Sequence, residues 1–306
     1  MSHQTQRHAY LVAAHNHPAQ LLTLLRMLDD SENDLYVHVD RKASDISEDA
    51  LRLAVANATI HFVERLDAGW GSERFIDVIV SLLEAATRVE HSYYHLVSGS
   101  DLPLKPQREI REFFATHAGR EFVDLSAEEP DPALIHERLE RFTVRRLNRS
   151  AHFTAPWRGA VRLEQLSNRL QDLVGVNRLR GCPTRFQKGS VWFSITHGLA
   201  RFAVEHSAEN RPHYRYSTCA DEIWLQTLLL SSPFMENRYF MGYGDEGRAT
   251  MRFIDWPAGS WSPRVLTSAD YDAAMGSGLL FARKFDESVD PVVIERVSRT
   301  VGQPAG

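Results

Sequence analysis

AYLVAAHNHPAQLLTLLRMLDDSENDLYVHVD, residues 9–40, contains two short apolar runs separated by a leucine-rich segment. The runs Ala9–His15 and Asp34–Asp40 have the length and composition of buried strands. Between them, leucines recur at helical spacing after Pro18, a residue favoured in the first turn of a helix. This order predicts parallel strands joined by a right-handed crossover. The segment has no G-x-G-x-x-G and no Walker motif, which argues against a dinucleotide dehydrogenase or a P-loop enzyme.

The same alternation of strand and helix continues along the chain and predicts an α/β fold, with a mostly parallel central sheet flanked by helices. Further strands are expected at Ala58–Glu64, Tyr93–Gly99, Glu121–Leu125 and Lys188–Thr196, with a loop at 100–105. Further helices are expected within 69–89 and at Ile110–His117, Gly198–His206 and Asp221–Leu230. Residues 238–286 suggest short strands between Gly and Pro turns, and the end of the chain from Ser298 is expected to fray.

Composition excludes some classes of protein. The chain has 306 residues, 43% hydrophobic and 25% charged, with a net charge of −5, so it is a poor candidate for a general nucleic-acid binder. Its two cysteines, Cys182 and Cys219, are too few for a disulfide framework and are expected to stay reduced. No apolar run is long enough for a signal sequence or a membrane span. These features favour a cytoplasmic protein, with peripheral contact to the inner face of the membrane left open.

Two carboxylates follow apolar strands. Asp40 ends LYVHVD, and Asp101 follows the strand in YYHLVSGSD. Ligands of open parallel sheets bind beyond the carboxyl ends of the strands, so both are candidates for binding a ligand, although each could equally cap an ordinary turn. A lone carboxylate at Asp101 would make a poor magnesium or manganese site, because such sites need several oxygen ligands. The histidines are scattered, and none is assigned to a metal.

A second group of charged residues lies in the last third of the chain. Asp221 and Glu222 open an apolar helix, where acids routinely stabilise the helix dipole; alternatively, one of them is a general base. The cations Arg264, Arg283 and Lys284 could stabilise negative charge on a leaving group. They could also be ordinary surface charges.

Taken in order, the segments YLVAAHNHPAQLLTLLRML, LYVHVDRKA, GWGS, YYHLVSGSDLPLK, KGSVWFSIT, DEIWLQTLL and LLFARKFD resemble the core-2/I-branching β-1,6-N-acetylglucosaminyltransferase family, which also contains the peptide O-xylosyltransferases. The resemblance implies a GT-A-like, Rossmann-like fold. It also implies an inverting transfer of N-acetylglucosamine or xylose from a UDP-sugar to an acceptor hydroxyl, without a metal. By motif, Glu222 is the catalytic base, Lys284 with Arg264 binds the diphosphate, and Asp40 and Asp101 lie on the nucleotide side. The same segments add four candidate substrate-binding residues: Trp70, Ser100, Ser190 and Asp221.

The resemblance also suggests how one domain, residues 1–306, is organised. A nucleotide-binding half would span about 9–125, a helical acceptor-side insertion about 126–187, a catalytic and acceptor half about 188–290, and a tail 291–306. The expected partners are a UDP-sugar, which is a co-substrate rather than a cofactor, and a glycan or glycoconjugate acceptor. Animal relatives carry a membrane anchor and several disulfides, whereas we expect this chain to be a compact, cytoplasmic, bacterial-type member that builds surface polysaccharide or another glycoconjugate.

Two alternatives keep the fold but change the activity. One is a protein that binds nucleotide sugars without turning them over. The other is a hydrolase, which would need a second carboxylate placed to activate water.

Overall fold

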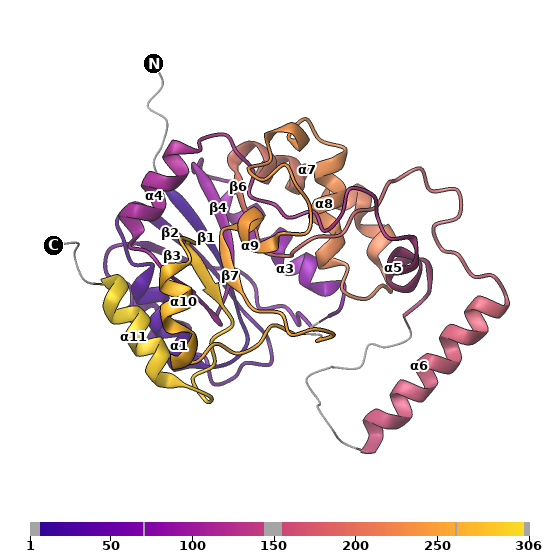
Figure 1. Ribbon diagram of the computed structural model, residues 1–306, viewed down its shortest axis with the longest axis horizontal. Coiled ribbons are helices and arrows are strands. Elements are labelled where there is room, and N and C mark those ends of the chain that lie inside the picture. Colours follow the sequence, from indigo (N-terminus) through magenta and orange to yellow (C-terminus); the bar gives the residue numbers. More distant parts are fainter. Residues whose placement is uncertain (1–6, 70, 144–154, 261, 303–306) are drawn as a thin grey trace.

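The computed structural model describes residues 7–69, 71–143, 155–260 and 262–302. A central sheet lies between two layers of helices (Figure 1). The sheet contains β1 (His8–Ala14), β2 (Asn33–Val39), β3 (Thr59–Phe62), β4 (Tyr93–Ser98) and β6 (Ser194–Thr196), in the order β3-β2-β1-β4-β6. Only the β4–β6 pairing is antiparallel. The expected α/β fold with a mostly parallel central sheet is therefore confirmed.

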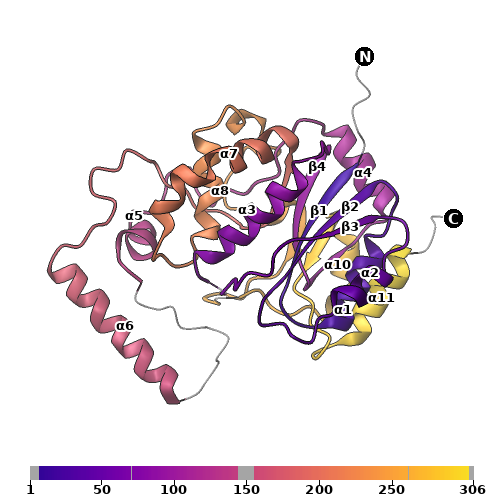
Figure 2. The ribbon, with the colours of Figure 1, turned by 180° about the vertical axis from the view of Figure 1, so that it is seen from behind.

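Alternating residues of the central strands feed two separate hydrophobic clusters. In β1, Tyr10 and Val12 pack with one cluster and Leu11 with the other. The first cluster includes residues from α1 (Pro18–Met27), α2 (Glu48–Leu53), α4 (Gln107–Thr116), α10 (Tyr271–Gly276) and α11 (Pro291–Gly302). The second includes α3 (Arg74–Ala86), α7 (His197–Tyr214) and α8 (Asp221–Leu230), seen from behind in Figure 2. Because both faces are covered, the strands are apolar on both sides.

A small second sheet lies beside the carboxyl end of β4. It contains β5 (Asp101–Pro103), β8 (Phe281–Arg283) and β7 (Arg252–Ile254), in the order β5-β8-β7. The helix α9 (Glu246–Thr250) precedes β7, and two 3₁₀ helices span Met235–Asn237 and Ser268–Asp270. The register of the small sheet pairs Asp101 with Arg283, so this sheet brings a late cation to an early acid.

The segment predicted to be an acceptor-side insertion, about 126–187, has helices in its described part. It contains α5 (Pro132–Ile135), the π-helix His136–Glu140 and α6 (Ala155–Leu173). Both views show α6 standing away from the body of the molecule (Figures 1 and 2).

Several sequence expectations about single elements were wrong. Of the strand expected at Lys188–Thr196, only Ser194–Thr196 joins the sheet, and Glu121–Leu125 makes isolated bridges instead of a regular strand. The loop expected at 100–105 contains the short strand β5. The tail is not frayed from Ser298, because α11 continues to Gly302 with Val297 and Val301 buried. The helical spacing of those valines was a usable signal.

Glu121 gives the fold a testable pH dependence. Its oxygens accept hydrogen bonds from the Thr196 backbone N–H (2.9 Å) and hydroxyl (2.5 Å), yet burial raises the pKa of its carboxyl to about 7. The folded state then holds a proton that the unfolded state has lost, so this group destabilises the fold as pH rises from about 4.5 to 7. We expect Glu121→Gln to gain up to about 3 kcal/mol of stability relative to the wild type between pH 5 and pH 8, measured by urea unfolding. Parallel pH dependence in the two proteins would contradict this.

Candidate active site

The carboxyl ends of the central strands bring the early motifs to one edge of the sheet. The parallel register pairs Ala14 of β1 with Val39 of β2, and Ala13 with Ser98 of β4. Asp40 and Asp101 follow β2 and β4 and therefore lie beyond this edge. The strand order reverses between β1 and β4, and such a switch point is where open α/β sheets bind ligands.

Asp40 holds a glycine loop in place. One carboxylate oxygen accepts from the Lys42 backbone N–H (2.9 Å) and the other from the Ala68 N–H (3.0 Å). Ala68 leads into Gly69 and Gly71, whose φ angles of 52° and 71° are readily adopted only by glycine. Trp70, the predicted substrate-binding residue between them, lies outside the described residues.

The same loop contacts the segment before α8. The Gly71 carbonyl accepts from the Cys219 backbone N–H (3.0 Å) and from the Thr218 hydroxyl (3.2 Å). The GWGS and DEIW motifs, about 150 residues apart in the sequence, are therefore neighbours in space.

Glu222, in the first turn of α8, is held by two cations. Its Oε2 accepts from Nη1 of Arg138 at 2.6 Å and lies 3.7 Å from Nζ of Lys188. Arg138 comes from the π-helix of the insertion, and the side chains of both Arg138 and Glu222 are largely buried. These contacts fix the direction of the carboxylate before any substrate binds.

Asp221 is in a different environment from its neighbour. Burial, and next the negative charge of Glu222, raise the pKa of its carboxyl to about 7. Its Oδ1 is buried without a hydrogen-bond partner among the described residues. The two adjacent acids thus differ clearly in their surroundings.

Asp101 already has partners for both of its oxygens. It accepts from the Ser98 backbone N–H (2.8 Å) and hydroxyl (3.0 Å), and Nε of Arg283 lies 3.6 Å from its Oδ1. The Arg283 guanidinium stacks 3.9 Å from the centre of the Trp192 ring. The predicted substrate residue Ser100 is buried, and its carbonyl accepts from the Phe285 N–H (2.8 Å). Asp101 therefore faces a buried cation.

Lys284 lies next to this pair and is partly buried. Its Nζ donates to the Ser262 hydroxyl (3.4 Å), and burial, followed by the charge of Arg283, lowers its pKa. His15 follows β1 and keeps some exposed surface. Desolvation by the surrounding protein atoms lowers its pKa; the charges of Lys284 and Arg283 lower it further, and the charge of Asp40 raises it. The charges of Asp40, Arg283 and Lys284 thus all affect the pKa of the His15 imidazole.

Arg264 is engaged elsewhere. Its guanidinium donates to Asp255 (2.7 Å) and to both oxygens of Asp270 (2.7 and 2.8 Å), and these hydrogen bonds, the Asp270 bonds first, raise its pKa. A diphosphate would have to displace at least one of these carboxylates. Its assignment to the diphosphate stays a prediction, and Arg283 is the cation that lies beside Lys284 and Asp101.

Ser190 belongs to a cluster that the sequence did not reveal. Its backbone N–H donates to Asp124 (3.0 Å) and its hydroxyl to Glu246 (2.5 Å), which also accepts from Nε1 of Trp256 (2.7 Å). Burial, and next the charge of Glu246, raise the pKa of Asp124 to about 6. No motif links these positions.

Other features of the described chain bear on the earlier expectations. Within it, no group of three or more His, Cys, Asp or Glu side chains could hold a metal ion. Cys182 and Cys219 are not joined to each other. Across the described ranges, every helix is too short or too polar to cross a membrane.

Comparison with known proteins gives the family. The model of the Core-2/I-Branching enzyme family matches residues 8–275. A xylosyltransferase of Ciona intestinalis is 20% identical over 308 residues, which cover 95% of this chain and 34% of that protein. The chain thus spans about a third of the length of this relative.

Two solved structures show weaker similarity. S. aureus TarS 1–349 is 10% identical with a TM-score of 0.33, and the match covers 73% of this chain and 55% of that one. The apo form of mouse xyloside xylosyltransferase 1 is 12% identical with a TM-score of 0.32, and the match covers 72% of this chain and 82% of that one. The family model, by contrast, covers most of the sequence, and it describes the family that the sequence segments resemble. The chain therefore belongs to the Core-2/I-Branching enzyme family.

Proposed function

We propose that this protein is an inverting, metal-independent glycosyltransferase of GT-A-like fold that moves a sugar from a UDP-sugar to an acceptor hydroxyl. N-acetylglucosamine is the first candidate sugar and xylose the second. The observation that carries the proposal is the position of Glu222. It is an oriented carboxylate on a helix whose preceding segment is bonded to Gly71, and in the same chain the early acid Asp101 meets the late cation Arg283 beyond the carboxyl end of the sheet.

In the proposed reaction Glu222 accepts the proton of the acceptor hydroxyl. The acceptor oxygen forms a bond to the anomeric carbon, and the bond from that carbon to the diphosphate oxygen breaks. UDP leaves with the bonding electrons. One carboxylate is sufficient for this displacement, whereas a hydrolase needs a second one placed to activate water.

The departing diphosphate requires positive charge that is fixed in advance. Lys284 is suited to this role because it is partly buried and the hydrogen bond from its Nζ to Ser262 is long. Arg283, next to it, has an Nη1 that is buried without a hydrogen-bond partner among the described residues. The contacts of Asp101 with Ser98 and Arg283 also make it a poor metal ligand, which supports cations rather than a metal at the diphosphate.

A thermal-shift titration with UDP tests the donor site. Because a ligand that binds only the folded state raises its stability, we expect UDP to raise the Tm, with or without EDTA. Lys284→Ala should weaken the shift, and Lys105→Ala, at a lysine outside the proposed site, should leave it unchanged. A shift abolished by EDTA would mean that a metal serves the diphosphate, and the absence of any shift would remove UDP as the donor nucleotide.

Assays on the same protein preparation distinguish both alternatives, binding without turnover and hydrolysis. A UDP shift combined with acceptor-dependent release of UDP from one UDP-sugar in a donor panel supports the transferase, whereas release that needs no acceptor would favour the hydrolase. A UDP shift without release from any sugar donor, in the presence of a glycan acceptor panel, would favour the binding protein.

A further inference from the structure

Helix α6 presents an apolar face that the rest of the described chain leaves exposed. Leu163, Leu166, Leu170, Leu173 and the adjacent Val174 are between 53% and 82% exposed. Spacings of three and four residues put the four leucines on one face of the helix. A single exposed leucine is unremarkable, but a stripe of this length is typical of an interaction surface.

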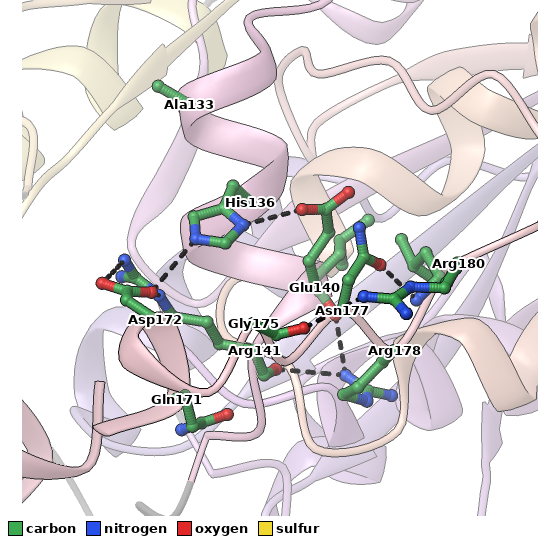
Figure 3. A network of polar contacts seen from close by, with 12 residues as sticks. Ala133, His136, Glu140, Arg141, Gln171, Asp172, Gly175, Asn177, Arg178 and Arg180 are labelled. Atoms are coloured by element: carbon green, nitrogen blue, oxygen red, sulfur yellow. Dashed lines mark hydrogen bonds and ion pairs between the residues drawn. The ribbon is translucent and has the colours of Figure 1, made fainter. Parts of the chain in front are cut away.

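Polar side chains in the last turn of the same helix bind the π-helix and the residues that follow it (Figure 3). Asp172 accepts two hydrogen bonds from Arg141 (2.6 and 2.7 Å) and lies 3.2 Å from the ring of His136, while Gln171 both donates to and accepts from the backbone of Phe142. These contacts fix which face of α6 points outward. The leucine stripe is therefore an outer surface of the folded chain.

The sequence that contains α6 is more basic than the rest of the chain. Residues 141–180 contain nine arginines against two acids, Glu164 and Asp172, although the whole chain has a net charge of −5. Arg162 and Arg169 are exposed and immediately precede Leu163 and Leu170, so they flank the stripe. A leucine face edged by arginines is the pattern of helices that lie in the surface of anionic membranes.

A second copy of the chain is a poorer partner for this face. In a heptad with leucines at a and d, Arg162 and Arg169 occupy the g positions, and Ser167 and Val174 the e positions. Paired helices would find no carboxylate there to match the arginines, and an antiparallel pair would bring like charges together. The basic flanks instead match lipid phosphates, which the long arginine side chains can reach while the leucines are buried.

We propose that the leucine face of α6 docks this protein on an anionic lipid surface, with the leucines at the acyl boundary and Arg162 and Arg169 directed to the phosphates. The π-helix that anchors α6 also carries Arg138, the partner of Glu222. Docking through α6 therefore couples the membrane surface to the candidate active site. The proposal does not depend on the proposed function, since lipid binding is measured without turnover.

Co-sedimentation of the full chain with vesicles tests the proposal. Phosphatidylcholine vesicles containing phosphatidylglycerol should carry the protein down, while vesicles of phosphatidylcholine alone should not. The triple variant Leu163→Glu, Leu166→Glu, Leu170→Glu should lose roughly 100-fold in partitioning, because burial of the leucines drives insertion. The variant Arg162→Gln, Arg169→Gln should bind more weakly and depend less on salt.

A matched control separates this face from the rest of the surface. Leu53, Val89 and Val292 are also more than half exposed but lie elsewhere; their replacement by Glu changes the same charge and should leave vesicle binding within about twofold, because surface substitutions of this kind rarely disturb the fold. Unaltered Tm values would show that both triple variants fold. Absence of binding to anionic vesicles, or equal loss in both triple variants, would overturn the proposal. A wild-type dimer in sedimentation velocity that the α6 variant abolishes would overturn it in favour of a second copy.

Discussion

Glu222→Gln should lower turnover by about 10²–10⁴-fold while UDP still binds. The amide keeps the shape of the side chain but cannot take the proton of the acceptor hydroxyl. Because the loss lies in the chemical step, it should appear in kcat, with little change in the KM for the donor. Initial rates with the donor found in the panel, together with the UDP thermal shift, measure both quantities.

Two variants make this result specific to Glu222. Glu236→Gln makes the same chemical change at an exposed site outside the proposed active site and should keep wild-type rates. Asp221→Asn tests the neighbouring acid, whose carboxyl has its pKa raised to about 7 and could serve as a base near neutral pH. If Asp221→Asn abolished turnover while Glu222→Gln kept it, the base would be Asp221.

The sequence could predict those parts of the site that are encoded locally. Asp40 and Asp101 were found because a buried parallel strand shows as an apolar run, and the residue after it must lie at the carboxyl edge. The bounds of α8 were predicted to the residue, since acids open it and apolar residues fill it. Local signals of this kind do not depend on what the rest of the chain does.

The partners of these residues are encoded by tertiary contacts instead. Arg138 lies 84 positions before Glu222 in a segment without a recognisable motif, and Asp124 meets Ser190 across 66 positions. Arg264 shows the reverse case, because its neighbours in the folded protein, Asp255 and Asp270, occupy the group that the motif suggested for the diphosphate. Sequence patterns indicate which residue types are present, but not which charges neutralise one another.

The strand wrongly predicted at Lys188–Thr196 has a related explanation. Its first part pairs with other segments instead of the sheet: the Ser126 N–H donates to the Lys188 carbonyl, and the Gly189 N–H donates to the Glu222 carbonyl (both 2.9 Å). The apolar run therefore predicted correctly that this segment is buried, but it did not predict which segments its backbone groups form hydrogen bonds with. Gly189 therefore lies between the backbone of Glu222 and that of Asp124.

Gly189→Ala should damage both the stability and the activity of the protein. A Cβ at this position would lie 1.9 Å from the carbonyl oxygen of Asp124 and 2.7 Å from its carbonyl carbon, and neither backbone atom can move without separating the segment of Asp124 from that of Gly189. Overpacking against backbone should lower the free energy of unfolding by about 3 kcal/mol or more, and turnover should fall because Glu222 and Asp124 are displaced. Urea unfolding and initial rates measure the two effects.

Gly276→Ala is the matched control: nothing lies within 4 Å of its added Cβ, so its stability should stay within about 0.5 kcal/mol of wild type. Wild-type stability in Gly189→Ala would mean that the segments around Asp124 and Glu222 are not packed against Gly189, and the close approach that holds this side of the site together would have to be abandoned.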